Sequence, residues 1–205
     1  MPDDEQLVET HAPVVVETRE SIVFIRLKRP AERNSLSVST LEELDRLVSA
    51  LSHRTDISAL VFTGTGDAFA SGADIRELSL LTPETANAFA RRGQRLMQRI
   101  ADAPQLTIAA VNGYCMGGGL DLALACDLRC AASSAVFAHP GARLGIITGW
   151  GGTQRLPRLI GQARALEMFM TARRLTAEEA YEIELVNRVG DPVLECALAM
   201  ARTRS

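Results

Sequence analysis

The chain has 205 residues, of which 47% are hydrophobic and 23% charged, and its formal net charge is −3. This composition is typical of one soluble globular domain whose core needs neither disulfides nor a metal. The slight negative charge, with Lys and Arg scattered along the chain, excludes an electrostatic case for nucleic-acid binding.

The beginning of the chain and its cysteines predict a cytoplasmic protein. Residues 1–12 are acidic where a secretion signal would be basic, and we expect them to be a loose start. No apolar run approaches 18 residues, so we expect no membrane partner. The four cysteines contain no C-x-x-C pair and the three histidines are far apart, so we expect reduced thiols and no metal site.

The first half of the chain predicts strands and helices in alternation. Residues 13–30 indicate two strands around a turn near 19–21, and 57–64 indicate a strand buried on both faces. Between them, leucines at helical spacing predict a helix that Ser39 or Thr40 would cap with Glu42 or Glu43. A glycine- and alanine-rich loop follows over 64–78. Residues 82–102 then predict a helix with a threonine cap and a proline in its first turn.

The second half continues the alternation. Residues 106–113 predict a buried strand, and the helix after it begins at the glycine triplet 117–119. One or two short strands are expected over 128–140, and a helical stretch over 154–174 that breaks at Pro157 or Gly161. Thr176 with Glu179 is expected to cap the next helix, before a short strand at 186–190 and a last helix. Together these elements predict a mostly parallel α/β domain.

Several familiar motifs are absent. Gly64 and Gly66 follow a strand, but Phe69 stands where a dinucleotide-binding fingerprint needs its third glycine. The sequence contains neither a P-loop motif nor a G-x-S-x-G nucleophile motif. His139 with Cys126 or Cys130 is a conceivable catalytic dyad, but no third orienting group is evident, which favours a structural histidine.

Two glycine loops, FASGADIREL (69–78) and GYCMGGGLDL (113–122), each follow a predicted buried strand. Carboxyl ends of parallel strands share one edge of a sheet, so both loops are expected there. Loops with small residues expose main-chain N–H groups, and two such groups aimed at one point form an oxyanion hole. The alternative is that the glycines serve only turns or close packing.

These segments resemble the enoyl-CoA hydratase/isomerase (crotonase) superfamily. The resemblance includes both glycine loops, the AERNSLS loop (31–37) and LGIITGWGGTQRLPRLIG (144–161), in the family's order over about residues 14–189. It implies the crotonase-like fold, a ββα superhelix with mostly parallel sheets flanked by helices. Residues 13–190 would form the acyl-CoA domain, and 191–205 a shortened C-terminal helix.

The resemblance implies a substrate and a site. The substrate would be an acyl-CoA thioester, with coenzyme A as part of it and no other cofactor, and the amides of Ala73 and Gly118 would hold the thioester oxygen. Arg33 would meet a CoA phosphate, or would only be solvated. The positions that match the family's substrate-binding residues are Ala31, Arg33, Leu36, Ala70, Gly72, Asp74, Ile75, Tyr114, Gly117, Pro140 and Gly141.

The chain departs from the family pattern in its acids. Hydratases of the family use two glutamates, and here the first matches Asp121, which is one methylene shorter, while the second matches Gly141. Asp121 is therefore the candidate general acid/base, with helix capping as the alternative. Isomerases of the family also need further acids, and the dienoyl-CoA type would need them where Gly141 and Gly149 stand. Decarboxylation or cleavage, or acyl-CoA binding without catalysis, stay open as alternatives.

The family's usual oligomer is a trimer, so the resemblance implies a homotrimer or a hexamer. Family members usually continue with more helices after the segment that matches VNRVG, and these helices cover the acyl end of the pocket and pack in the trimer. Here only residues 191–205 follow that segment. We therefore expect either a reduced trimer contact or a pocket wall that comes from elsewhere.

Overall fold

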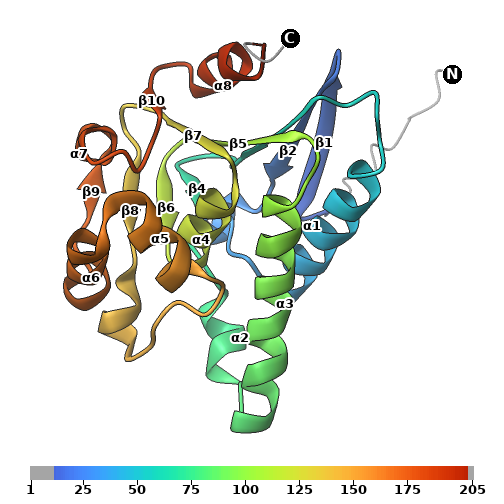
Figure 1. The fold of residues 1–205 in the computed structure, drawn as a ribbon. Coiled ribbons are helices and arrows are strands. Elements are labelled where there is room, and N and C mark those ends of the chain that lie inside the picture. The colour runs from blue at the N-terminus through green and yellow to red at the C-terminus, as the bar shows by residue number, and fades with distance from the viewer. Residues whose placement is uncertain (1–11, 203–205) are drawn as a thin grey trace, which may run out of the picture.

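The structure, a computed structural model, describes residues 12–202 and consists of two β-sheets with helices packed around them (Figure 1). All but one of the residues 1–12, expected to be a loose start, lie outside the described range. The larger sheet has the strand order β1 (Val14–Arg19), β2 (Ile22–Leu27), β3 (Ala59–Thr63), β5 (Leu106–Val111), β7 (Leu128–Ala131) and β10 (Arg188–Val189). The smaller sheet has the order β4 (Ala68–Ala70), β6 (Tyr114–Met116), β8 (Val136–Ala138) and β9 (Leu175–Thr176).

The pairing in both sheets is mostly parallel, as the sequence predicts. In the larger sheet only the β1–β2 hairpin is antiparallel, and in the smaller sheet only β8–β9. From β2 onward, successive strands of the larger sheet are joined by crossovers that carry helices or the strands of the smaller sheet, which is the connection that parallel pairing requires.

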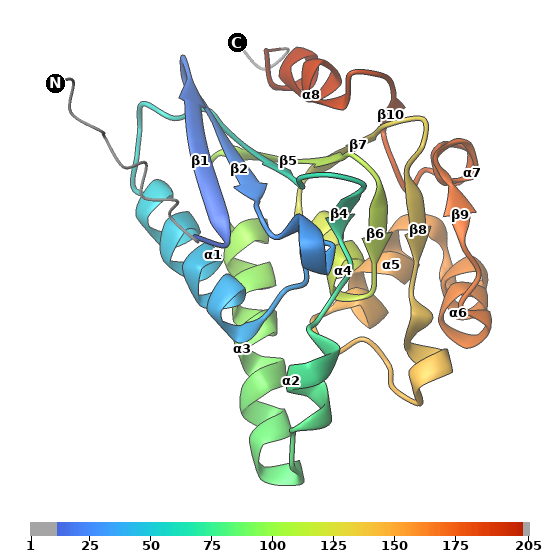
Figure 2. The ribbon, with the colours of Figure 1, turned by 180° about the vertical axis from the view of Figure 1, so that it is seen from behind.

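The central strands of the larger sheet are buried on both faces, whereas the edge strands β1 and β10 are largely exposed. Alternate residues of β2 contribute to different cores, with Val23 and Ile25 on one face and Ile22 and Phe24 on the other. Helices α1 (Val38–Leu51) and α3 (Pro83–Ala101) cover the first face, and α8 (Val193–Arg202) packs on the second (Figures 1 and 2). Of the last segment, 191–205, the described part contains α8, which closes the smaller core.

The predicted helix boundaries are mostly confirmed. Thr82 caps α3, and Thr176 and Glu179 form the predicted capping box of α7 (Ala177–Glu182). The predicted cap of α1 is wrong, because the helix begins earlier and Ser37 accepts the hydrogen bond of the Thr40 amide. Of the two predicted breaks, the chain uses Gly161, whose φ of 85° ends α5 (Gly152–Ile160) before α6 (Gln162–Thr171).

The sequence prediction missed β4, β6 and the short helix α2 (Ile75–Ser79), which it interpreted as loops. β4 and β6 have only three residues each, and they pair in parallel with each other. The small residues of the two glycine loops, 71–73 and 117–119, come directly after β4 and β6, so they lie at one edge of the smaller sheet, beside α4 (Gly118–Ala125), and not at the ends of the larger sheet's strands (Figures 1 and 2). This edge positions the candidate site.

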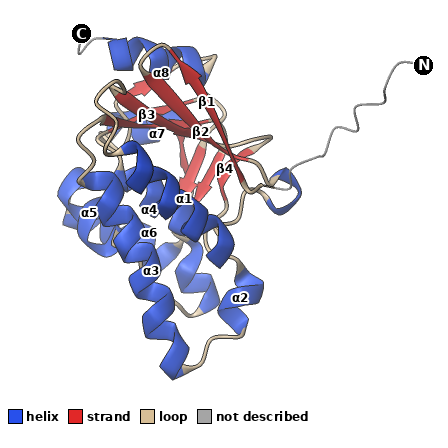
Figure 3. Ribbon diagram, turned by 90° about the vertical axis from the view of Figure 1, so that its right-hand side faces the viewer, coloured by secondary structure: helices blue, strands red, loops and turns tan. Residues whose placement is uncertain are grey.

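Helices α1, α3 and α5 gather on one side of the sheets, where α2 and α3 extend farthest from them (Figure 3). Within residues 12–202, no helix has both the length and the apolar character needed to cross a membrane.

Candidate active site

The two glycine loops lie almost in contact. Gly72 has a φ of 103°, and a Cβ at this position would lie 2.9 Å from the Met116 carbonyl oxygen and 3.2 Å from the Gly118 nitrogen. Only glycine allows this close approach. Within residues 12–202, the main-chain amides of Ala73 and Gly118 donate no hydrogen bond to the backbone of a loop or a helix cap. Both residues therefore have amides free to bind a ligand.

A cavity of about 250 Å³ opens beside these loops. Its wall includes Gly72, Ala73, Gly117, Gly118 and Asp121, and continues through the segment 139–150. The rest of the wall is largely apolar and includes Ile75, Leu78, Phe89, Leu144, Ile146 and Ile147. The cavity therefore combines two unbonded amides, one acid and a hydrophobic surface.

Asp121 lies in the first turn of α4, and its side chain is completely buried. Its Oδ2 accepts a hydrogen bond from the Thr148 hydroxyl, and its Oδ1 has no hydrogen-bond partner in the described chain. Burial raises the pKa of Asp121 to about 6, although the Thr148 hydroxyl and the Trp150 amide oppose the shift. The carboxyl group bonds to the loop opposite α4, which disfavours the helix-capping alternative.

His139 lies beside Asp121, with its Nε2 3.6 Å from Asp121 Oδ1. The imidazole is buried, packs on the Phe169 ring at a centroid distance of 4.9 Å, and lines the same cavity. Burial lowers the pKa of His139 to about 4. At neutral pH the site therefore holds a carboxylate and an uncharged imidazole. The sequence prediction considered only cysteines as partners of His139, and this aspartate was missed.

The backbone around Gly141 leaves no room for a side chain. The residue lies in the short 3₁₀ helix Pro140–Leu144, and a Cβ on it would lie 2.5 Å from the Ile146 carbonyl oxygen. The Ile146 amide also donates a hydrogen bond to the Gly141 carbonyl at 3.0 Å. The loop is therefore folded around a glycine at position 141, and a glutamate there would require the backbone to move.

Trp150 is a second residue that sequence reasoning missed. Its indole lies against Gly118 of α4 and Gly93 of α3, and a Cβ on either glycine would overlap the ring. Phe89 packs on it at a centroid distance of 5.6 Å. A glycine inside a long helix signals such a close contact, and Gly93 was the available indication.

Comparisons with known sequences and structures place the chain in a family. The sequence model of the enoyl-CoA hydratase/isomerase family matches residues 17–203. The chain belongs to this family. Similar proteins include a crotonyl-CoA hydratase of Syntrophomonas wolfei, 41% identical, and a short-chain-enoyl-CoA hydratase of Clostridium acetobutylicum, 37% identical. Each alignment covers 87% of this chain and 69% of the relative.

The fold of the family is confirmed by solved structures. The crystal structure of an enoyl-CoA hydratase from Bacillus anthracis matches with a TM-score of 0.90 at 38% identity, over 93% of this chain and 76% of that one. The resemblance carried by the glycine loops and the two other motifs is thus confirmed, and so is the mostly parallel α/β class.

The positions predicted for substrate binding fall into two groups. Gly72, Ile75, Gly117, Pro140 and Gly141 line the cavity with Ala73, Gly118 and Asp121. The others do not line this cavity: Ala31, Arg33, Leu36, Ala70, Asp74 and Tyr114.

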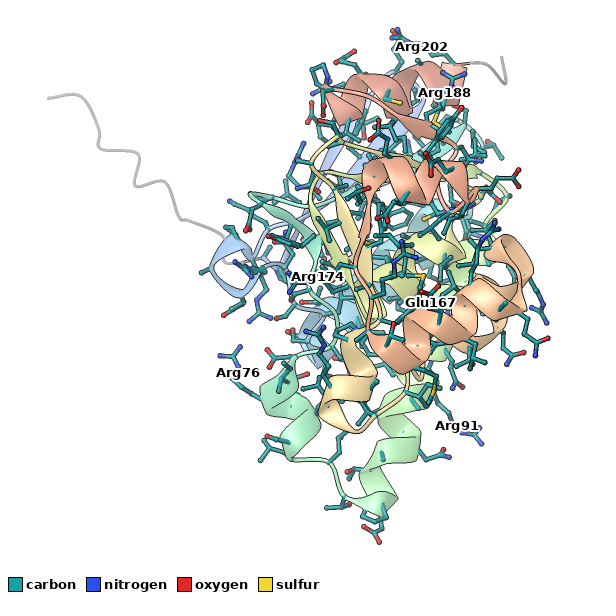
Figure 4. All side chains as sticks on the ribbon, turned by 90° about the vertical axis from the view of Figure 1, so that its left-hand side faces the viewer. Arg76, Arg91, Glu167, Arg174, Arg188 and Arg202 are labelled. Atoms are coloured by element: carbon teal, nitrogen blue, oxygen red, sulfur yellow. The ribbon has the colours of Figure 1, made fainter. Side chains whose placement is uncertain are left out.

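The second group divides by exposure. Leu36 and Ala70 are completely buried in the core, so neither presents a surface to a ligand in this structure. Arg33 is exposed, with its guanidinium 5.3 Å from the centre of the Tyr114 ring. Asp74 caps α2 and is bonded by the exposed Arg76 (Figure 4). Residues 12–202 contain no group of three or more His, Cys, Asp or Glu side chains arranged to bind a metal ion.

Proposed function

We propose that this chain is an enoyl-CoA hydratase-like enzyme that adds water to the double bond of an enoyl-CoA thioester. Family membership supports the chemistry of acyl-CoA thioesters. The observation that carries the proposal is the arrangement of one cavity, in which two unbonded amides and one buried carboxyl group line a largely apolar wall.

The amides of Ala73 and Gly118 would hold the thioester oxygen. Conjugation carries negative charge onto this oxygen as water attacks, so donors fixed at that point stabilise the enolate-like state. Gly118 is the first residue of α4, where the helix dipole adds to the attraction. Losing one such donor typically costs about 2.7–4 kcal/mol of transition-state stabilisation.

Asp121 would move the proton. Its pKa of about 6 leaves it ionised at neutral pH and close enough to neutrality to return the proton it accepts. The bond from Thr148 to Oδ2 fixes the carboxylate, so that Oδ1 is the atom left for the reaction. One carboxylate can serve both proton transfers of a hydration, because the proton taken from water is the proton delivered to the α carbon.

The substrate's remaining parts would occupy the apolar wall and the outer surface. The aliphatic residues of the cavity suit an acyl chain. The loop 31–36 would contact the CoA portion, with Arg33 near a phosphate. Coenzyme A would arrive as part of the substrate, and no further cofactor is proposed. We also propose that the protein is cytoplasmic and that it assembles as a homotrimer or hexamer. Light scattering of the purified protein would test the assembly.

The test is hydration of crotonyl-CoA, followed by loss of the enoyl absorbance, for the wild type and Asp121→Asn. We expect turnover by the wild type and a loss of at least 100-fold in the variant. Equal rates for the two proteins would remove Asp121 from the mechanism. A wild type inactive on a panel of enoyl-CoA chain lengths would contradict the hydratase proposal.

The closed backbone at Gly141 favours one alternative, acyl-CoA binding without catalysis. Tight binding of acyl-CoA by calorimetry, with no turnover of any thioester in the panel, would support it. Release of carbon dioxide from a malonyl-type thioester, or migration of a double bond, would instead indicate another reaction of the family.

A further inference from the structure

Two of the buried polar atoms without partners belong to the site. In residues 12–202, the buried side-chain nitrogen and oxygen atoms that lack a hydrogen bond are Asp121 Oδ1, His139 Nε2 and Gln105 Oε1. The Gln105 amide is still anchored, because its nitrogen donates to the carbonyls of Leu51 and Arg54. Leaving a buried polar atom unpaired costs about 1–3 kcal/mol, so a facing pair of such atoms indicates a ligand or a water between them.

The separation of the two atoms fits one small bridging molecule. A distance of 3.6 Å is too long for a direct hydrogen bond between Nε2 and Oδ1. A water placed to one side of the line between them can lie about 2.8 Å from each atom. Both residues line the cavity of about 250 Å³, but Asp121 Oδ1 and His139 Nε2 are themselves covered in this structure, so a water reaches them only after a small shift of the surrounding side chains.

We propose that Asp121 Oδ1 and His139 Nε2 together hold the water that adds to the substrate, so that His139 replaces the acid missing at Gly141. This inference rests on the proposed hydratase function. It assigns His139 as a catalytic residue, since its imidazole would touch a reacting molecule.

The addition balances with these groups alone. One O–H bond of the water breaks and its proton passes to Asp121 Oδ1, while the water oxygen bonds to the β carbon. The electron pair of the double bond moves into the thioester as an enolate, held by the amides of Ala73 and Gly118. The α carbon then takes the proton from Asp121, which restores the carboxylate.

His139 stays uncharged throughout and accepts a hydrogen bond from the second hydrogen of the water. This requires the tautomer with its proton on Nδ1. The burial that keeps the imidazole neutral, with a pKa of about 4, suits an acceptor in this position. The tilted contact with Phe169 holds the ring plane.

The experiment compares two reactions that differ in their need for water. Hydration of crotonyl-CoA needs the bound water, whereas exchange of the α protons of butyryl-CoA in D₂O needs only the enolate site and Asp121. We expect His139→Phe to lower kcat for hydration at least 100-fold with KM changed less than threefold, and to lower exchange less than tenfold. His139→Gln, which keeps a hydrogen-bonding group of similar reach, should retain hydration within tenfold of the wild type.

Each other result has a separate meaning. Equal loss of hydration and exchange in His139→Phe, with wild-type circular dichroism, would overturn the proposal in favour of a purely structural histidine. Unchanged hydration in His139→Phe would overturn it as well. Exchange without hydration by the wild type would overturn the water-holding role and leave enolate chemistry in place. A wild type with neither reaction would remove the proposed function itself.

Discussion

Two aspartates of this chain differ sharply although each lies in one of the glycine loops and both are buried. Asp74 caps α2, accepts the Arg76 amide and is bonded by the Arg76 guanidinium, which holds the pKa of its carboxyl at about 2. Asp121 lies in the first turn of α4 with one oxygen unbonded, and burial raises its pKa to about 6. The residue type is the same, and the partners decide the chemistry.

The comparison shows that burial alone does not mark a reactive acid. Asp74 is only 5% exposed, but every observed partner stabilises its charge. Asp121 has a hydroxyl and an amide as partners and no cation within hydrogen-bonding distance. An acid with a raised pKa and an unbonded oxygen in a cavity is the one suited to proton transfer.

The largest expected effect is a loss of hydration rate when the Asp121 carboxylate is displaced while the residue itself is kept. A Cβ on Gly152 would overlap Asp121 Oδ1, so Gly152→Ala should push the carboxylate out of place. We expect the rate of crotonyl-CoA hydration to fall 100- to 1000-fold, because small misplacements of reacting groups cost about 100-fold. Gly190→Ala, where the nearest atom would lie 3.8 Å away, is the matched control. Wild-type rates in both variants would show that the carboxylate position is unimportant.

The next largest effect is that of Asp121→Asn on the free energy of unfolding. Because the folded pKa of Asp121 exceeds its unfolded value, the ionised form destabilises the native state, and stability is lost as pH rises through about 6. Asp121→Asn should therefore raise the free energy of unfolding by up to about 3 kcal/mol at pH 8, and by about half of that at pH 5. Urea unfolding at both pH values measures this difference. A variant less stable than the wild type at pH 8 would contradict the assignment.

The pH dependence of catalysis should report the same group. Asp121 must be ionised to accept a proton, so kcat/KM for hydration should fall about tenfold for each pH unit below 6. Asp102→Asn, at the exposed end of α3, is the control and should show the same fall in kcat/KM below pH 6 as the wild type. A flat profile between pH 5 and 8 would exclude Asp121 as the base.

The smallest expected effect is that of replacing Asp74 on the free energy of unfolding. Asp74→Ala removes the cap of α2 and should lower the free energy of unfolding by about 1 kcal/mol at pH 7. The folded pKa of Asp74 is lowered, so its contribution is present above about pH 4 and is lost as pH falls toward 2. The wild type and the variant should thus converge in thermal unfolding between pH 4 and pH 2. A constant difference would mean that the charge of Asp74 contributes nothing.

Much of the fold was predictable because its signals are local. The threonine caps of α3 and α7 and the alternation of buried strands with helices are visible in short windows of sequence. Strands β4 and β6 were not predictable, since three residues carry no periodic pattern and their pairing joins segments about 45 residues apart. The start of α1 was misplaced because Ser37, Ser39 and Thr40 are all competent caps and only the backbone conformation selects one.

The candidate site was predictable to the extent that it follows a motif. The resemblance to the family pointed to Ala73, Gly118 and Asp121, and the structure places all three in the wall of one cavity, while their roles stay a prediction. The approach of His139 to Asp121 was not predictable, because the residues lie on different elements and only tertiary packing brings them together. The closure of the backbone at Gly141 depends on the Ile146 carbonyl and has no signal in composition.

The wall formed by 139–150 has a consequence for how this site could be altered. One continuous stretch of 12 residues carries the imidazole, the closed glycine, the hydroxyl that fixes the carboxylate and the indole behind Gly118. Introducing a glutamate at Gly141 alone would meet the main chain of the same stretch. An acid at position 141 is therefore expected to be accommodated only if the whole segment 139–150 is exchanged at once, with Asp121 of α4 kept in place.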